Sequence, residues 1–163
     1  MQTRIAKTPL YIALTALTLS LGVLVAPPTA LAQANQTAQA VAFPINLNTA
    51  SDAEILSVPG VGSRMLREFK EYRPYVNIEQ FERELGKYVD QAQVQQWEQY
   101  VFVPTNPNTA TAYQLMALKG VDKAMADYII AGRSYKDWAT LKAALLKKYE
   151  AKTVDALQRY WIF

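Results

Sequence analysis

The chain has 163 residues, with 17 Lys and Arg against 14 Asp and Glu, and it contains neither His nor Cys. Without those two residue types it has no disulfide and no thiol or His-based catalytic centre. It also lacks the ligands of almost every zinc site. Paired carboxylates or a Ser–Lys couple remain, but neither shows a distinctive spacing. We therefore expect a protein that is not an enzyme, has no small-molecule substrate and holds no cofactor or metal.

Residues 1–34 have the layout of a secretory signal peptide. A short positive region precedes an apolar run at 10–26, and small residues suited to cleavage follow at Ala32 and Ala34. The alternative, a retained membrane anchor, is disfavoured because the run is close to the minimum spanning length and ends at two prolines. We expect cleavage after Ala32 or Ala34 and an exported protein, in a periplasm, outside the cell or in a thylakoid lumen.

The stretch 48–73 predicts a helix, a tight glycine hairpin and a second helix. Pro59 should end the first helix, while Gly60 and Gly62 permit backbone angles that a Cβ forbids. Ser63 can cap the second helix, whose apolar residues recur at helical spacing. Such a hairpin directs several backbone N–H groups at one exposed point beside a helix N-terminus, which is an anion site.

Residues 56–63, Leu-Ser-Val-Pro-Gly-Val-Gly-Ser, together with the preceding Leu-Asn-Thr-Ala at 47–50, resemble the helix-hairpin-helix family. The resemblance is closest to its exported competence-protein branch, the ComEA-like proteins. It implies a hairpin that grips the backbone of double-stranded DNA across the minor groove, weakly and without reading sequence, as phosphate contacts do. The site residues that it implies are Gly60, Val61, Gly62, Ser63, Arg64 and Arg67.

An internal repeat with an offset of 60 residues predicts two tandem modules. Asn-Thr-Ala at 48–50 returns at 108–110, and Gly-Val at 60–61 returns at 120–121. We expect an all-α fold without strands, made of two helix-hairpin-helix modules. After the signal peptide at 1–34 come a flexible leader at 35–44, the first module at 45–104 and the second module at 105–163.

Polar residues at the expected helix starts predict N-caps. They are Thr49 or Ser51 for the first helix of the first module, Asn77 for its third helix, and Asp122 for the hairpin helix of the second module. We expect the aromatic residues that follow, Trp97 among them, to lie in the core.

The hairpin of the second module departs from the family pattern. Lys119 stands where the first module has Pro59, and Asp122 stands where it has Gly62, so a carboxylate would repel a phosphate there. Lys119 and Lys123 offset this charge in part. The secondary candidate site comprises Lys119, Gly120, Val121 and Lys123.

A second function from another class stays open. Residues 35–104 carry 6 basic and 9 acidic residues, whereas residues 105–163 carry 9 and 5, so the better-formed hairpin lies in the acidic half. The layout of each module also resembles the PsbU-type extrinsic proteins of photosystem II. That resemblance implies structural hairpins in a non-enzymatic scaffold that docks on a membrane protein complex.

Overall fold

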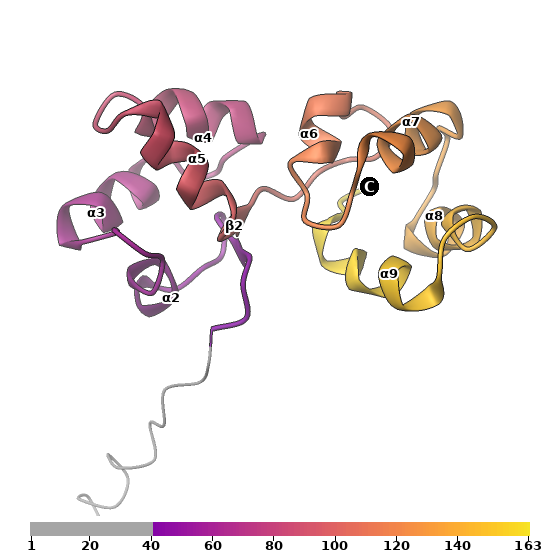
Figure 1. The fold of residues 1–163 in the computed structure, drawn as a ribbon, viewed down its shortest axis with the longest axis horizontal. Coiled ribbons are helices and arrows are strands. Elements are labelled where there is room, and N and C mark those ends of the chain that lie inside the picture. Colours follow the sequence, from indigo (N-terminus) through magenta and orange to yellow (C-terminus); the bar gives the residue numbers. More distant parts are fainter. Residues whose placement is uncertain (1–40) are drawn as a thin grey trace, which may run out of the picture. The chain divides into compact units, whose positions relative to one another are not determined.

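The computed structural model describes residues 41–163, which form a mainly α-helical fold with one short parallel sheet (Figure 1). The predicted signal peptide and the leader up to residue 40 lie outside the described residues. Within 41–163 no helix combines the length and the apolar character needed to cross a membrane. In chain order the elements are β1 (Ile45–Asn46), α2 (Asp52–Leu56), α3 (Ser63–Glu71), α4 (Ile78–Leu85), α5 (Gln91–Glu98), β2 (Val101–Phe102), α6 (Ala112–Met116), α7 (Lys123–Ala131), α8 (Trp138–Leu145), α9 (Ala151–Ala156) and the 3₁₀ turn η1 (Gln158–Tyr160).

The short sheet corrects the prediction of an all-α fold without strands. β1 and β2 pair in parallel with Ile45 opposite Val101, and an isolated parallel bridge joins Thr105 to Trp161. α5 ends at Glu98, and Val101 follows it in an extended segment. The Val-Phe-Val run favours an extended backbone, and it pairs with the entry segment of the module, which is remote in sequence.

Phe43 and Pro44, at the end of the segment predicted to be a flexible leader, pack against other residues. Phe43 packs edge to face against Tyr100 with ring centroids 5.0 Å apart, and Pro44 is buried. The Pro44 carbonyl also accepts a hydrogen bond from Arg159 Nη2 at 2.7 Å. The last residues of the predicted flexible leader at 35–44 are therefore packed, because their apolar side chains reach the core.

Three predicted N-caps are confirmed: Ser51, Asn77 and Asp122. Ser51, rather than Thr49, caps α2 and forms a capping box in which the Glu54 carboxylate accepts from the Ser51 N–H. Asn77 accepts from the Gln80 N–H at the start of α4. These local bonds satisfy backbone donors that the opening turn of a helix leaves free.

Two clusters of buried side chains hold the fold, and aromatic residues form the centre of the first. Phe69, Phe81 and Trp97 are at most 1% exposed, and Phe69 packs edge to face on both others with centroids 5.3 Å apart. The prediction that these aromatics are core residues is confirmed. The second cluster is mainly aliphatic and includes Leu115, Ile129, Leu141, Leu145 and Leu157.

Each half of the chain ties its entry segment to the turn after its hairpin helix. Asn48 Nδ2 donates to the Tyr75 carbonyl at 2.9 Å, and the Tyr75 N–H donates to Asn48 Oδ1 at 2.7 Å. Asn108 makes the same two bonds with Tyr135, each at 2.8 Å. In each half, these paired bonds tie the segment before the two hairpin helices to the turn that follows them.

Side chains of α6 bond to carboxylates of α4, beside an unusual acidic residue. The Tyr113 hydroxyl donates to Glu82, and Gln114 Nε2 donates to Glu79 at 3.0 Å. Glu98 at the end of α5 has a buried Oε1 with no hydrogen-bond partner within residues 41–163. Burial first, and then the charge of Glu82, raise the pKa of Glu98 to about 7.

The raised pKa predicts a pH dependence of stability that Glu98→Gln removes. An unfolded Glu titrates near 4.5, so ionisation of Glu98 disfavours the folded state increasingly between pH 4.5 and 7. The stability of the Gln variant relative to wild type should therefore rise from pH 5 to pH 8, measured by urea unfolding. A stability difference that stays constant over this pH range would contradict the prediction.

Candidate functional site

The first hairpin is a sharp turn between α2 and α3, fixed by one glycine and one buried valine. Gly60 has φ +79°, a left-handed conformation that residues with a Cβ rarely adopt. The next residue, Val61, is 7% exposed and points into the core, and its N–H donates to the Val58 carbonyl at 3.1 Å. The N–H of Val61 is therefore not free for an external anion, which corrects its inclusion among the backbone contacts.

The N-terminus of α3 has no side-chain cap. Gly62, not Ser63, is the N-cap residue, so the prediction that Ser63 caps this helix is wrong. Ser63 is the first helical residue, where its hydroxyl cannot act as the N-cap acceptor. Within residues 41–163, the N–H groups of Gly62, Ser63, Arg64 and Met65 have no backbone or side-chain acceptor. Four convergent donors are therefore left for solvent or an anion.

Two arginines follow these amides. Arg64 is exposed on the first turn of α3, and the Arg67 side chain is 73% exposed, with its Nε 3.8 Å from Glu68 Oε1. Lys70 is less available, because its Nζ lies 2.6 Å from Asp52 Oδ1. Arg64 and Arg67 therefore keep largely solvated charges, and they are the nearest such cations in sequence to the open amides.

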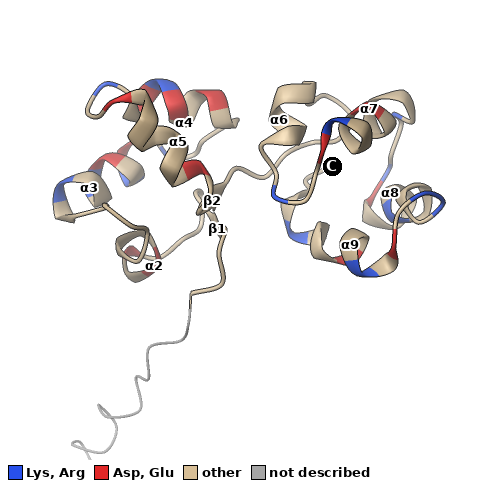
Figure 2. Ribbon diagram, viewed as in Figure 1, with Lys and Arg blue, Asp and Glu red and all other residues tan. Residues whose placement is uncertain are grey.

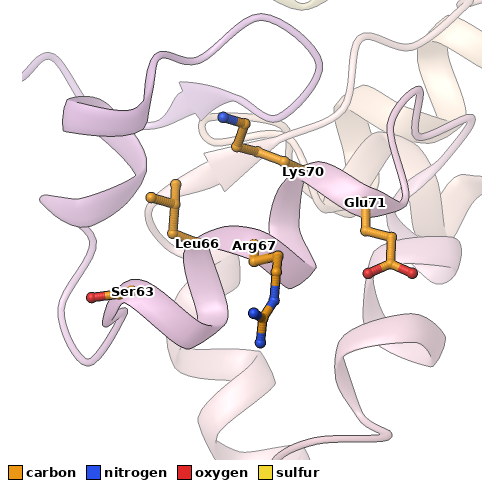
Figure 3. Close-up of a pocket in the computed structure, with 5 residues that line it drawn as sticks. All are labelled: Ser63, Leu66, Arg67, Lys70 and Glu71. Atoms are coloured by element: carbon orange, nitrogen blue, oxygen red, sulfur yellow. The ribbon is translucent and has the colours of Figure 1, made fainter.

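A shallow hollow of about 450 Å³ runs along α3 next to the hairpin, lined by Ser63, Leu66, Arg67, Lys70 and Glu71. In Figure 3 the Arg67 guanidinium and the Lys70 ammonium extend to opposite sides of the helix. They do not form a single clamp around one ligand atom. The hollow is a surface depression beside the open amides.

The second hairpin repeats the turn, but a carboxylate caps one amide of the helix that follows it. Gly120 has φ +95°, and the Val121 N–H donates to the Leu118 carbonyl at 3.0 Å. Asp122 is the N-cap of α7, as predicted, and its Oδ1 accepts from the Met125 N–H at 2.8 Å. Lys123 Nζ lies 2.7 Å from Asp127 Oδ2, so this cation is paired as well.

Of the secondary candidates, Lys119 keeps an exposed side chain at the second hairpin. It borders two surface hollows with Phe43, one of which also contains Gly120 and Arg159. The secondary residues are thus brought together in space, but an internal carboxylate occupies the position that a bound anion would take. We therefore expect the second hairpin to bind an anion less well than the first.

The structure adds one residue that the sequence did not assign to the hairpin. Trp97 Nε1 donates to the Pro59 carbonyl at 2.9 Å, across 38 positions of sequence. Its ring also lies against Gly60, whose Cβ, if present, would be 3.7 Å from Nε1. The sequence gives one indication of this role: the second half has Leu157 in place of Trp97, 60 residues later.

The arrangement presents donors to an external group: backbone amides, the Ser63 hydroxyl and two guanidinium groups. Donors of this kind bind and position an anion, and none of them is a base or a nucleophile paired with one. The chemistry that this surface supports is therefore binding of a phosphate or carboxylate.

The left-handed turn predicts a contrast between two glycine substitutions. Gly60→Ala should lower the free energy of unfolding by about 1–2 kcal/mol, because a Cβ strains a backbone with φ +79°. Gly62→Ala should change it by less than about 0.5 kcal/mol, because its backbone is extended and no atom lies within 4 Å of an added Cβ. Urea unfolding measures both, and equal effects would refute the contrast.

Comparison with known proteins identifies no relative: no family model, no curated protein and no solved structure matches this chain. Neither the fold nor the site can therefore be transferred from a homologue.

Proposed function

We propose that this chain is an exported, non-enzymatic protein of two tandem helix-hairpin-helix modules that binds double-stranded DNA weakly and without sequence preference. The first hairpin makes the contact: the amides of 62–65 bind a phosphate, and Arg64 and Arg67 bind its neighbours. Backbone amides and guanidinium groups contact the sugar-phosphate backbone in this way without reading bases.

The tandem arrangement is supported by features that recur 60 residues apart. The Asn–Tyr bonds of each half, the left-handed glycines at 60 and 120, and the parallel pairings Ile45–Val101 and Thr105–Trp161 all keep this offset. Such agreement between distant contacts favours duplication of one unit. It also makes the two hairpins a matched pair within one molecule.

The observation that carries the proposal is the difference between the two helix starts. The chain satisfies one amide of α7 with the Asp122 carboxylate, whereas α3 begins at Gly62 and keeps its amides open. A helix start left open beside two exposed arginines favours an external anion. The anion that a helix-hairpin-helix protein would bind is a nucleic-acid phosphate.

Duplex binding should weaken with salt and with the loss of hairpin donors. With roughly two or three phosphates neutralised, affinity should fall about tenfold or somewhat more between 50 and 200 mM salt. Gly62→Asp, which copies the cap of the second hairpin, should reduce affinity at least about tenfold, and Arg64→Ala should lower both the affinity and the salt slope by about one contact. Fluorescence anisotropy with a random-sequence duplex measures these changes.

Lys136→Ala is the matched control for that titration. Lys136 is an exposed cation of the second module that lies away from both hairpins in sequence, and its loss should leave affinity nearly unchanged. Wild-type protein that shows no duplex binding at low salt, or a Gly62→Asp variant that binds as tightly as wild type, would overturn the proposal.

Opening the second hairpin should have the opposite effect. Asp122→Gly removes the carboxylate that caps the Met125 amide and reproduces the residue of the first hairpin. Because glycine is itself a tolerated N-cap residue, the cost in stability should be only a few tenths of a kcal/mol. Duplex affinity should rise several-fold and the salt slope should steepen. A variant that folds but binds no more tightly would show that Asp122 does not block the second site.

The alternative is a PsbU-like scaffold that docks on a membrane protein complex. It is favoured by the distribution of charge, with acidic residues along α4 and Lys residues on α8 and the turn after it (Figure 2). Exposed apolar side chains such as Leu56 and Val76, 45% and 74% exposed, would suit protein contact. This function takes precedence if duplex binding is undetectable at low salt.

A further inference from the structure

We infer that Trp97 is the positioning residue of the first hairpin: its indole N–H holds the Pro59 carbonyl and so keeps the open amides of α3 directed at solvent. This inference rests on the proposed function for its effect on binding, but the positioning itself can be measured without DNA. The residue touches no ligand and acts through the hairpin backbone.

Trp97 is buried in the core, whereas Pro59 and Gly60 of the hairpin that it contacts are exposed. Its side chain is 1% exposed, and its ring packs edge to face on Phe69, which in turn packs on Phe81. The indole nitrogen therefore has a set position in the core. The hydrogen bond of 2.9 Å from this nitrogen holds the Pro59 carbonyl in place, although Pro59 is exposed at the turn.

The contact extends to the glycine that makes the turn. An added Cβ at Gly60 would lie 3.5 Å from Gln93 Nε2 and 3.7 Å from Trp97 Nε1, so α5 lies directly against the hairpin backbone. Movement of the Pro59–Gly60 peptide would break the indole bond and separate these surfaces. It would also change the direction of the amides that follow at 62–65.

The second hairpin lacks this anchor. Leu157 takes the place of Trp97 and touches the position of a Cβ on Gly120 at 3.5 Å, but it has no N–H to donate. Packing is thus kept while the hydrogen bond is lost. The same hairpin has the Asp122 carboxylate at its helix start, so the module without an anchored turn is also the one that caps an amide of its hairpin helix.

Trp97→Phe removes the donor while keeping an aromatic ring on Phe69. The measurement is amide hydrogen exchange by NMR without DNA, using the Val61 and Leu66 amides, whose acceptors are the Val58 and Gly62 carbonyls. Exchange of both should accelerate at least about tenfold relative to the Phe69 amide in the same helix. Trp97→Leu, which copies the second module, should act in the same direction.

Trp161→Phe is the matched control, because the buried Trp161 Nε1 has no hydrogen-bond partner within residues 41–163. It should leave exchange at Val61 and Leu66 unchanged. On the random-sequence duplex, Trp97→Phe should lower affinity about fivefold with the salt slope unchanged, because the number of phosphate contacts stays the same.

Each outcome decides a separate point. Unchanged exchange at Val61 and Leu66 in Trp97→Phe overturns the positioning role, whatever the protein binds. Faster exchange in Trp97→Phe with unaltered duplex affinity supports the positioning of the turn but overturns its effect on binding, since the hairpin would then bind equally well when loosened. Faster exchange in a protein whose wild type binds no duplex supports the positioning role and refutes DNA binding instead.

Discussion

The left-handed turn at Gly60 is the constraint on which the exposed face of the first module depends. It reverses the chain between α2 and α3 within a few residues, so that Val61 enters the core while its neighbours on both sides remain at the surface. A residue with a Cβ would strain this turn, and a longer loop would not hold the helix start in one direction. The amide site is therefore a consequence of chain reversal and of the burial of one valine.

The same backbone can be open or closed to anions, and one residue decides which. Every helix leaves its first N–H groups without intrahelical acceptors, and something must satisfy them. In the second hairpin the chain supplies the Asp122 carboxylate. In the first, Gly62 supplies nothing, so solvent or an external anion does. The difference costs the fold little, because glycine is tolerated at an N-cap, whereas it changes the charge at the site by a full unit.

Features set by neighbouring residues could be predicted from the sequence, and features set by distant contacts could not. Ser51, Asn77 and Asp122 cap their helices as predicted, because a cap is a bond to a residue three positions on. Ser63 failed for a related reason: the helix starts one residue earlier than its hydroxyl required, a shift that sequence patterns do not determine.

Two contacts could not be predicted from the sequence: the parallel pairing of Ile45 with Val101 and the hydrogen bond from Trp97 to Pro59. Both join segments that are dozens of residues apart, and nothing in the local pattern of either segment specifies its partner. The hydrophobic pattern correctly predicts that Trp97 lies in the core. Its hydrogen bond to the hairpin depends on the direction of its ring nitrogen, which the packing of Phe69 and α5 determines.

The acidic balance of the first half does not by itself oppose anion binding at its hairpin. At physiological ionic strength, exposed charges more than about 8–10 Å apart are largely screened from each other. The groups that matter are then the nearest ones: four amides and two arginines, with Lys70 already bonded to Asp52. If the site binds duplex DNA as proposed, so few cations would make the binding weak, since affinity for duplex DNA grows with the number of phosphates neutralised. With few cations, such a site depends on amides that are held in one direction. We infer that the buried indole of Trp97 holds them through its bond to Pro59.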